Sequence, residues 1–457
     1  MTTFSGLNQK HLPIAVPLVA LSLMLSSALG QSGPPREIDA PKEIDLSKTG
    51  NSRDARELYE EANRYVEKKY EDFNRRKISF DPALETAARQ EQKDLAARNA
   101  SIAARTATAG DDLYYLGLLY HLAGNSDSAL VTLRKFLSAT PNGQFAQVAR
   151  SAIVVHALRK GAVAEAETAL AQYVQQEPQD RQAVYDMESL IVEAFYKQNN
   201  YDRMAAHAGG MLAAATQLAT SNTSSGIDPY KRDEMLLKST TLLSEAYRKL
   251  GKKDAAVAAA DDLRKLAVLL PSGNLYKRAT NRLLEIEPRG DLLKVFSSAE
   301  AVADKEAPEL NADEWIGQAP LKLSELKGRV VLLDFWATWC GPCRFTFPKL
   351  RAWHNKYHEQ GLVVIGVTNF FGTVEGRSLS RSEELDYLRQ FRQKNNLPYG
   401  FAIANSEVND VHYSVSSIPM SFLIDRRGKV RFIATGSGEE QGMALGKMIK
   451  ELLDEPE

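Results

Sequence analysis

The 457-residue sequence predicts a multidomain protein in which an all-α helical repeat region precedes an α/β domain. Residues 52–290 are rich in Ala, Leu, Glu and Arg at helical spacing and show almost no strand signal. The pattern changes beyond residue 307, where the uninterrupted apolar run Val330–Phe335 is typical of a buried strand. An amphipathic helix is predicted from Pro342 to about His358, with apolar positions at Phe345, Leu350, Trp353 and Tyr357.

The first 30 residues have the pattern of a secretory signal peptide. Lys10 precedes an apolar stretch from about Pro13 to Leu25, and small residues at 28–30 precede a cleavage point at Gln31. The stretch is shorter than the ~20 residues of a membrane span, and an uncleaved anchor is the alternative. We therefore expect an exported protein of the periplasm or cell envelope. Residues 31–51 are predicted to form a disordered leader, because Pro, Ser, Gly and charged residues dominate them.

The composition is that of an ordinary soluble protein. Charged residues make up 25% and hydrophobic residues 44% of the chain, whose net charge is −1. Loss of residues 1–30, which contain one Lys and no acid, would make this −2. No basic patch indicates binding to nucleic acid or to an anionic membrane surface.

Helix–turn–helix repeats are expected within the helical region. The clearest copy comprises Leu113, Leu116, Gly117, Tyr120, Ala129, Leu133, Phe136 and Pro141. A second copy, displaced by 37 residues, comprises Ala157, Ala166, Leu170, Tyr173 and Pro178. These offsets resemble tetratricopeptide repeats, which implies a solenoid able to bind a protein partner. A generic helical bundle is the alternative. A loop is expected at Ser221–Ile227, and a linker at residues 291–306.

The only two cysteines of the chain form the motif Cys340-Gly-Pro-Cys343. The predicted order of strand, turn and helix places Cys340 at a helix N-terminus, where unpaired N–H groups and the dipole favour the thiolate. A zinc site would need about four ligands, so no metal is expected. A structural disulfide closing so short a loop would contribute only ~2 kcal/mol. Two merely packed cysteines would not need Gly-Pro between them. The motif therefore indicates thiol redox chemistry without a further cofactor.

Several motifs in the same order resemble one known family. They are residues 307–310, 323–328, the cysteine motif, 347–350, 361–367, 417–425 and 428–430. Together they are similar to the thioredoxin-fold, extracytoplasmic thiol–disulfide oxidoreductases of the TlpA/ResA type. The resemblance covers residues 307–457, about a third of the chain.

This resemblance implies a role for each matching residue. Cys340 corresponds to the attacking cysteine and Cys343 to the resolving cysteine, and the two form the redox disulfide Cys340–Cys343. Ile418-Pro419 corresponds to a cis-proline loop that offers backbone atoms to a substrate strand. Trp336 and Trp339 are both expected to pack around the site, and Trp339 is also placed among the substrate-binding residues.

Two further positions bear on proton transfer. Thr346 stands where many TlpA/ResA-type proteins have a glutamate, so the acid–base role of that glutamate does not transfer. Asp334 matches the buried aspartate of ordinary thioredoxins. Burial on a strand should raise its pKa and let it exchange a proton with Cys343. The alternative is an aspartate that is simply hydrogen-bonded at a strand end.

We therefore expect an exported thiol–disulfide oxidoreductase. The Gly-Pro dipeptide, shared with thioredoxins, favours a reductant. The expected partners are protein clients, a membrane thiol carrier as electron donor, and a protein on the helical repeats. A repeat-based scaffold with a redox-sensing domain is the alternative. A peroxidase would need Pro at position 333 and Ser or Thr at 337, but Leu333 and Ala337 stand there.

Overall fold

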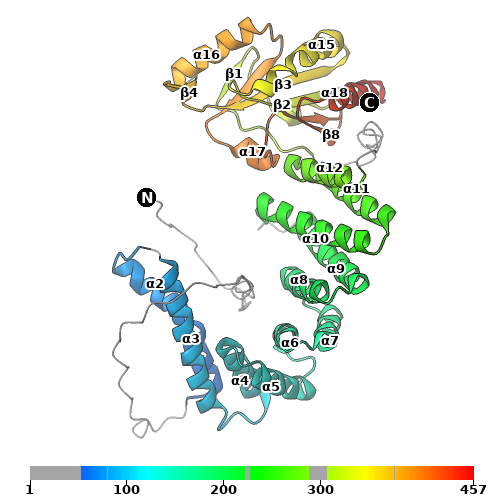
Figure 1. Ribbon diagram of the computed structural model, residues 1–457. Helices are drawn as coiled ribbons and strands as arrows, with labels where there is room; N and C mark the ends of the chain where they lie inside the picture. Colours follow the sequence, from blue (N-terminus) through cyan, green and yellow to red (C-terminus); the bar gives the residue numbers. More distant parts are fainter. Residues whose placement is uncertain (1–52, 80, 222–226, 288–305, 375, 457) are drawn as a thin grey trace, which may run out of the picture. The chain divides into compact units, whose positions relative to one another are not determined.

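A computed structural model describes residues 53–79, 81–221, 227–287, 306–374 and 376–456 (Figure 1). The predicted signal peptide (1–30), the leader (31–51) and all of the linker 291–306 except residue 306 lie outside these ranges. So does most of the predicted loop Ser221–Ile227. The chain falls into two compact units, residues 1–198 and residues 199–457.

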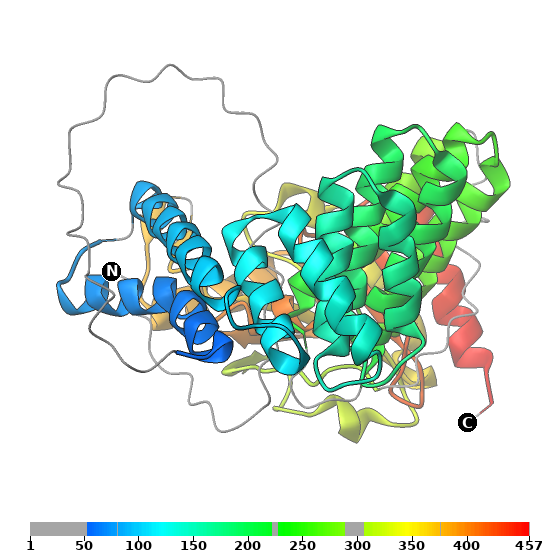
Figure 2. The ribbon, with the colours of Figure 1, turned by 90° about the horizontal axis from the view of Figure 1, so that it is seen from below.

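The first unit is helical in the residues that the structure describes. Its helices are α1 (Ala55–Asn63), α2 (Tyr65–Arg75), α3 (Pro82–Ala103), α4 (Gly110–Ala123), α5 (Ser126–Ala139), α6 (Ala146–Arg159), α7 (Val163–Val174) and α8 (Arg181–Lys197). Short polar side chains start several of them, since Asp54, Asp81, Asn125 and Asp180 each accept a hydrogen bond from a first-turn N–H. Short loops join neighbours, so α4 packs on α5 and α6 on α7 as helical hairpins (Figures 1 and 2).

The predicted repeat positions lie inside these hairpins. Leu113, Leu133 and Phe136 are buried between α4 and α5. A Cβ atom at Gly117 would collide with the side chain of Leu133. Ala129 is fully buried as well. Small residues at these positions therefore allow the two helices to approach closely, as the sequence pattern predicted.

The second unit combines further helices with a mixed β-sheet. Its helices before the sheet are α9 (Tyr201–Thr220), α10 (Pro229–Lys249), α11 (Lys253–Leu269) and α12 (Gly273–Ile286). The sheet strands are β1 (Glu314–Ile316), β2 (Val330–Phe335), β3 (Leu362–Asn369), β6 (Gly400–Ala404), β7 (Met420–Ile424) and β8 (Val430–Thr435), and β4 (Thr373–Val374) pairs with β5 (Arg377–Ser378). The helices and turns among them are η3 (Leu323–Leu326), α14 (Gly341–Arg344), α15 (Phe347–Tyr357), η4 (His358–Gln360), α16 (Arg381–Lys394), α17 (Val408–His412) and α18 (Glu439–Asp454).

The sheet has the strand order β1-β6-β3-β2-β7-β8. Strand β2 lies at its centre, parallel to β3 and antiparallel to β7, and all six of its residues are buried. The parallel β2, β3 and β6 are joined through helices, which is the α/β arrangement that the sequence predicted. Together with the preceding helices, this sheet confirms the predicted fold class.

Both faces of the sheet are covered. Helices α15, α16 and α18 contribute to a core with Leu332 and Trp336 on one face. Side chains alternate along a strand, so Phe335 points to the other face, where its ring packs on Tyr413 and Phe422. Helix α12 begins against this second face, because a Cβ atom at Gly273 would collide with Met420 in β7. The helices before the sheet thus pack directly onto the α/β domain.

One local prediction was wrong. The single helix expected from Pro342 to about His358 is two helices, α14 and α15, separated at Phe345 and Thr346. Leu350 and Tyr357 are buried as expected, but Phe345 is 73% exposed. The interruption before Pro348 changes the helical phase, so Phe345 no longer shares the buried face of α15. In the described residues no helix is long and apolar enough to span a membrane.

Candidate active site

The two cysteines form a disulfide at the start of α14. Cys340 is the N-cap residue of this helix, and its Sγ accepts a hydrogen bond of 3.1 Å from the N–H of Cys343. The Cα atoms are 5.3 Å apart. Cys343 is fully buried and Cys340 is 4% exposed. The predicted helix N-terminus is therefore confirmed, and it directs a backbone N–H at the sulfur of Cys340.

Asp334 is fully buried at the centre of the sheet. Its Oδ1 accepts a hydrogen bond of 2.8 Å from the Ser421 hydroxyl in β7, whereas Oδ2 has no partner in the described residues. Burial raises the pKa of Asp334 to about 7, and the Ser421 hydrogen bond offsets only part of that shift. Alternation along β2 places its side chain on the face of Leu332 and Trp336, whose core also contains both cysteines.

Tyr399 is a neighbour of Asp334 that sequence reasoning did not single out. It is 2% exposed, and its hydroxyl has no hydrogen-bond partner in the described residues. Burial raises the pKa of Tyr399, and the nearby Asp334 carboxylate raises it further. Two buried groups that can each carry a proton therefore lie on the core side of the site. The sequence around Tyr399, a single tyrosine before a glycine, did not indicate that this residue lies near Asp334.

The two tryptophans of the motif have different environments. Trp336 is 2% exposed and packs against Phe347 and Phe401. Trp339 is 63% exposed, and its ring forms a T-shaped pair with the ring of Phe371, with centroids 5.6 Å apart. Trp336 is thus a core residue, as expected. Trp339 instead presents an apolar surface to solvent beside the disulfide.

The Ile418–Pro419 peptide bond is cis, which confirms the expectation from the resemblance. The carbonyl oxygen of Pro419 accepts a hydrogen bond of 2.8 Å from the N–H of Gly436. Thr346, at the position without the family's glutamate, donates from Oγ1 to the carbonyl oxygen of Cys343 at 2.8 Å. The Thr346 hydroxyl therefore satisfies a backbone carbonyl group near the C-terminal end of α14.

The segment before the cis-proline is held by the preceding helices. The N–H groups of Gly273 and Asn274, at the start of α12, donate to the carbonyl oxygens of Tyr413 and Ser414 at 2.9 and 2.7 Å. Lys277 Nζ donates to Ser417 Oγ at 2.9 Å. The residues leading into the cis-proline loop therefore contact α12 through both backbone and side chain.

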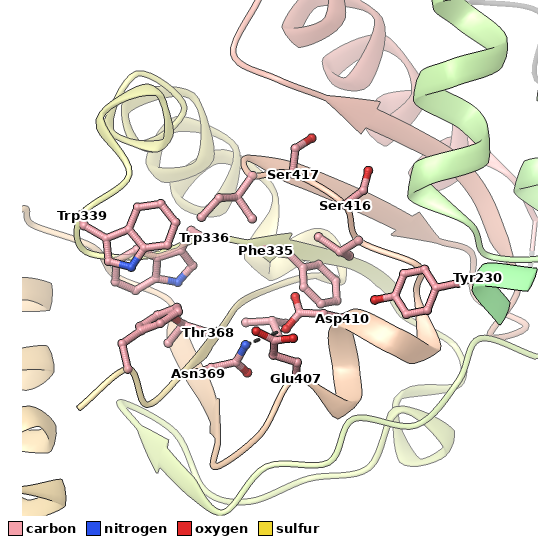
Figure 3. A pocket seen from close by; sticks show the side chains of 14 residues that line it. Tyr230, Phe335, Trp336, Trp339, Thr368, Asn369, Glu407, Asp410, Ser416 and Ser417 are labelled. Atoms are coloured by element: carbon pink, nitrogen blue, oxygen red, sulfur yellow. Dashed lines mark hydrogen bonds between the residues drawn. The ribbon is translucent and has the colours of Figure 1, made fainter. Parts of the chain in front are cut away.

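A pocket of about 240 Å³ opens beside these elements (Figure 3). Its lining comes from the cysteine loop, β3, the α17 region, the segment before the cis-proline and helix α10. The lining residues are Tyr230, Phe335, Trp336, Trp339, Val367, Thr368, Asn369, Phe371, Glu407, Asp410, Val415, Ser416, Ser417 and Ile418. Two predicted site residues, Trp339 and Ile418, thus share one pocket. Nothing in the sequence indicated that Tyr230, 110 positions before Cys340, would join them.

Comparison with known proteins agrees with this geometry. Residues 303–433 match the AhpC/TSA family. The thiol-disulfide oxidoreductase ResA of Bacillus thuringiensis subsp. konkukian is 30% identical over 149 residues, which cover 32% of this chain and 77% of that protein. The chain belongs to the ResA-type thiol-disulfide oxidoreductases.

Two further matches cover a similar share of the chain. ResA of Bacillus cereus is 33% identical over 126 residues, which cover 28% of this chain, and the chain spans 65% of the length of that relative, which is less than two thirds. A crystal structure described as a thiol:disulfide interchange protein DsbE from Chlorobium tepidum is 31% identical. That match has a TM-score of 0.27 and covers 33% of this chain and 96% of the other.

In the part of the chain that the structure describes, no three His, Cys, Asp or Glu side chains form a metal-ligand cluster. The site itself brings together two cysteines and two buried groups that can carry a proton, Asp334 and Tyr399.

Proposed function

We propose that the protein is an exported thiol–disulfide oxidoreductase that reduces disulfides in client proteins. The observation that carries this proposal is the buried Asp334 on the sheet face of the cysteine pair. Its pKa is about 7, and its Oδ2 accepts no hydrogen bond from the described residues. A group with a pKa near the working pH exchanges protons efficiently. A disulfide that served only stability would have no use for one.

The proposed reaction starts from the reduced protein. The Cys340 thiolate attacks one sulfur of a client disulfide, which forms a mixed disulfide and releases the other client sulfur as a thiolate. Asp334 accepts the proton of Cys343. The Cys343 thiolate then attacks Cys340 Sγ, closes the Cys340–Cys343 disulfide and releases the second client thiolate. Two electrons have passed to the client, and a membrane thiol carrier would return the pair to the dithiol.

Client binding is proposed at the cis-proline loop. An extended client segment can add its backbone beside Ile418 and Pro419, in the manner of strand addition. The exposed ring of Trp339 would cover the apolar part of that segment. Both Trp339 and Ile418 line the pocket beside the disulfide, which supports a binding role for this side of the domain.

The remaining parts of the chain are assigned by their sequence patterns. We propose residues 1–30 as a signal peptide, residues 52–290 as tetratricopeptide-like repeats and residues 307–457 as the redox domain. The burial of Ala129, Ala157 and Ala166 in the hairpins supports the repeat assignment. A stacked array of hairpins presents a surface for a protein partner.

A redox titration tests the proposal. Residues 31–457 are equilibrated in glutathione buffers, and free thiols are trapped at each potential. A midpoint more negative than about −230 mV would agree with a reductant, whereas a midpoint near about −120 mV would make the protein an oxidant. A Cys340→Ser variant should trap no client. Absence of any exchange by the unaltered protein would contradict the proposal.

A further inference from the structure

The pocket beside the disulfide is acidic. Glu407 and Asp410 both line it, and no lysine or arginine is among its lining residues. In the described part of the chain, neither carboxylate lies within ion-pair distance of a basic side chain. Figure 3 shows the ring of Tyr230 on one side of the carboxylates, with its hydroxyl directed toward them, and Trp339 on the other side. A cation entering here would meet two carboxylates between two aromatic rings.

Two buried polar groups of the lining also lack partners. Asn369 is 9% exposed and donates from Nδ2 to Asp410 Oδ2 at 2.6 Å, but its Oδ1 makes no hydrogen bond within the described residues. Thr368 is 3% exposed, and its Oγ1 is likewise unpaired there. A buried acceptor without a partner costs about 1–3 kcal/mol. A ligand that brings several N–H donors would remove this cost.

The aromatic wall opposite Trp339 belongs to the helical part of the chain. Tyr230 lies in the first turn of α10, whose N-cap is Asp228. Three residues further on, Asp233 is fully buried and accepts hydrogen bonds from the hydroxyls of Ser272 and Ser414 at 2.5 and 2.6 Å. Ser414 belongs to the segment that leads into the cis-proline loop. The position of Tyr230 is therefore fixed by buried hydrogen bonds rather than by surface contact alone.

We propose that this pocket binds a lysine or arginine side chain of the client, close in sequence to the client's reactive cysteine, and that Tyr230 is part of the client-binding site. This inference rests on the proposed function. A cation that packs against aromatic rings and pairs with a carboxylate gains both interactions in one place. Because Ile418 lines the same pocket, the cation would belong to the client segment that lies along the cis-proline loop.

The test uses residues 31–457 carrying Cys343→Ser, so that the mixed disulfide at Cys340 persists. The protein is first converted to its glutathione mixed disulfide. A short peptide thiol then exchanges with it, which releases glutathione and forms the peptide mixed disulfide, and the equilibrium constant is measured. Peptides are compared in pairs that differ only in lysine or norleucine, placed one or two residues before or after the cysteine.

We expect the equilibrium constant for the lysine peptide to exceed that for the norleucine peptide by about fivefold at one of these positions. A ratio of this size is the effect of one partly exposed charge pair. Tyr230→Ala and Asp410→Asn should each reduce this preference toward one. Tyr196→Ala and Asp386→Asn are matched controls, because Tyr196 is 52% exposed on α8 and the Asp386 side chain is 66% exposed on α16. Both controls should keep the preference.

The outcomes separate the two proposals. Equal equilibrium constants for lysine and norleucine at all four positions would overturn the pocket assignment while leaving thiol exchange intact. A preference that survives both pocket variants would also overturn it. Failure of Cys340 to form a mixed disulfide with any peptide would instead refute the proposed function. Tyr230→Phe keeps the ring and should retain most of the preference even if the alanine variant is poorly folded.

Discussion

Asp233 in α10 accepts a hydrogen bond of 2.6 Å from the hydroxyl of Ser414, although the two residues are 181 positions apart. The same carboxylate pairs with Arg232 at 2.7 Å and also accepts from Ser272. Asp233 is fully buried, so its hydrogen bonds form in a region of low dielectric constant. The carboxylate therefore ties two helices of the second unit to the loop that carries the cis-proline.

Replacement of Asp233 by alanine should strongly destabilise the second unit. The change leaves two buried hydroxyls and the largely buried Arg232 without their acceptor, which should cost about 3–5 kcal/mol. All four tryptophans lie between residues 315 and 353, so urea unfolding followed by tryptophan fluorescence reports on this unit. The midpoint should fall well below that of the unaltered protein.

Asp262→Ala is the matched control for that variant. The Asp262 side chain is 74% exposed on α11 and lies 3.8 Å from Lys265. Loss of so exposed a pair should change stability by less than about 0.5 kcal/mol. If Asp233→Ala were as stable as this control, the buried hydrogen bonds would not hold the unit together.

The stability of the oxidised protein should depend on Asp334. Its pKa is raised from 3.8 in a free chain to about 7 when folded, so the folded state keeps the proton longer than the unfolded state does. The free energy of unfolding should therefore fall as pH rises from about 4 to about 7, by about 4 kcal/mol in total. The amide of an Asp334→Asn variant resembles the protonated acid, so the free energy of unfolding of this variant should not show that fall with pH. The difference between Asp334→Asn and the unaltered protein, measured by urea unfolding, should grow from near zero at pH 4 to its maximum above pH 7.

An exposed aspartate serves as the reference. Asp386→Asn removes a carboxylate from a side chain that is 66% exposed on α16, so it controls for the change in net charge that the Asp334→Asn variant also brings. A pH-independent difference for Asp334→Asn would mean that the carboxylate titrates alike in the folded and unfolded states. It would also remove the basis for a proton-transfer role.

The Asp334→Asn variant should also slow the reduction of a client, at the step in which Cys343 attacks the mixed disulfide. Without Asp334, no carboxylate on β2 can accept the proton of Cys343, and loss of a general base costs about 100-fold in rate. The second-order rate constant for reduction of a disulfide peptide at pH 7 should fall by about that factor. The rate constant for alkylation of Cys340 by iodoacetamide should change by less than about threefold, because the helix N-terminus still stabilises the Cys340 thiolate. Equal slowing of both reactions would place Asp334 in the activation of Cys340 instead.

Much of the redox centre could be predicted from the sequence because its signals are local. A buried strand, a turn with two cysteines and a helix follow one another within about thirty residues, and Asp334 lies on that strand. The interruption at Phe345 and Thr346 was missed, since apolar spacing alone does not show a change of helical phase. The exposed Trp339 likewise could not be told from the buried Trp336 by residue type.

Contacts between distant segments left no trace in the sequence pattern. Tyr230 and Asp233 lie on a helix whose periodicity explains them as ordinary surface and core positions. Only the packing of α10 and α12 on the sheet brings them to the pocket and to the cis-proline segment. The helical region was expected to offer a separate binding surface, and the structure adds a direct contact with the redox domain.

Gly273 tests whether that contact depends on close packing. It is the first residue of α12, and a Cβ atom there would collide with Met420 and lie 3.2 Å from the ring of Phe422. Gly273→Ala should therefore push α12 from β7 and cost about 1–3 kcal/mol, despite the better helix propensity of alanine. Gly209→Ala in α9 is the matched control, because nothing lies within 4 Å of its added Cβ. That control should gain up to about 1 kcal/mol. Opposite signs in urea unfolding would support tight docking of α12 on the sheet, whereas a gain in both variants would show that the helix can shift without cost.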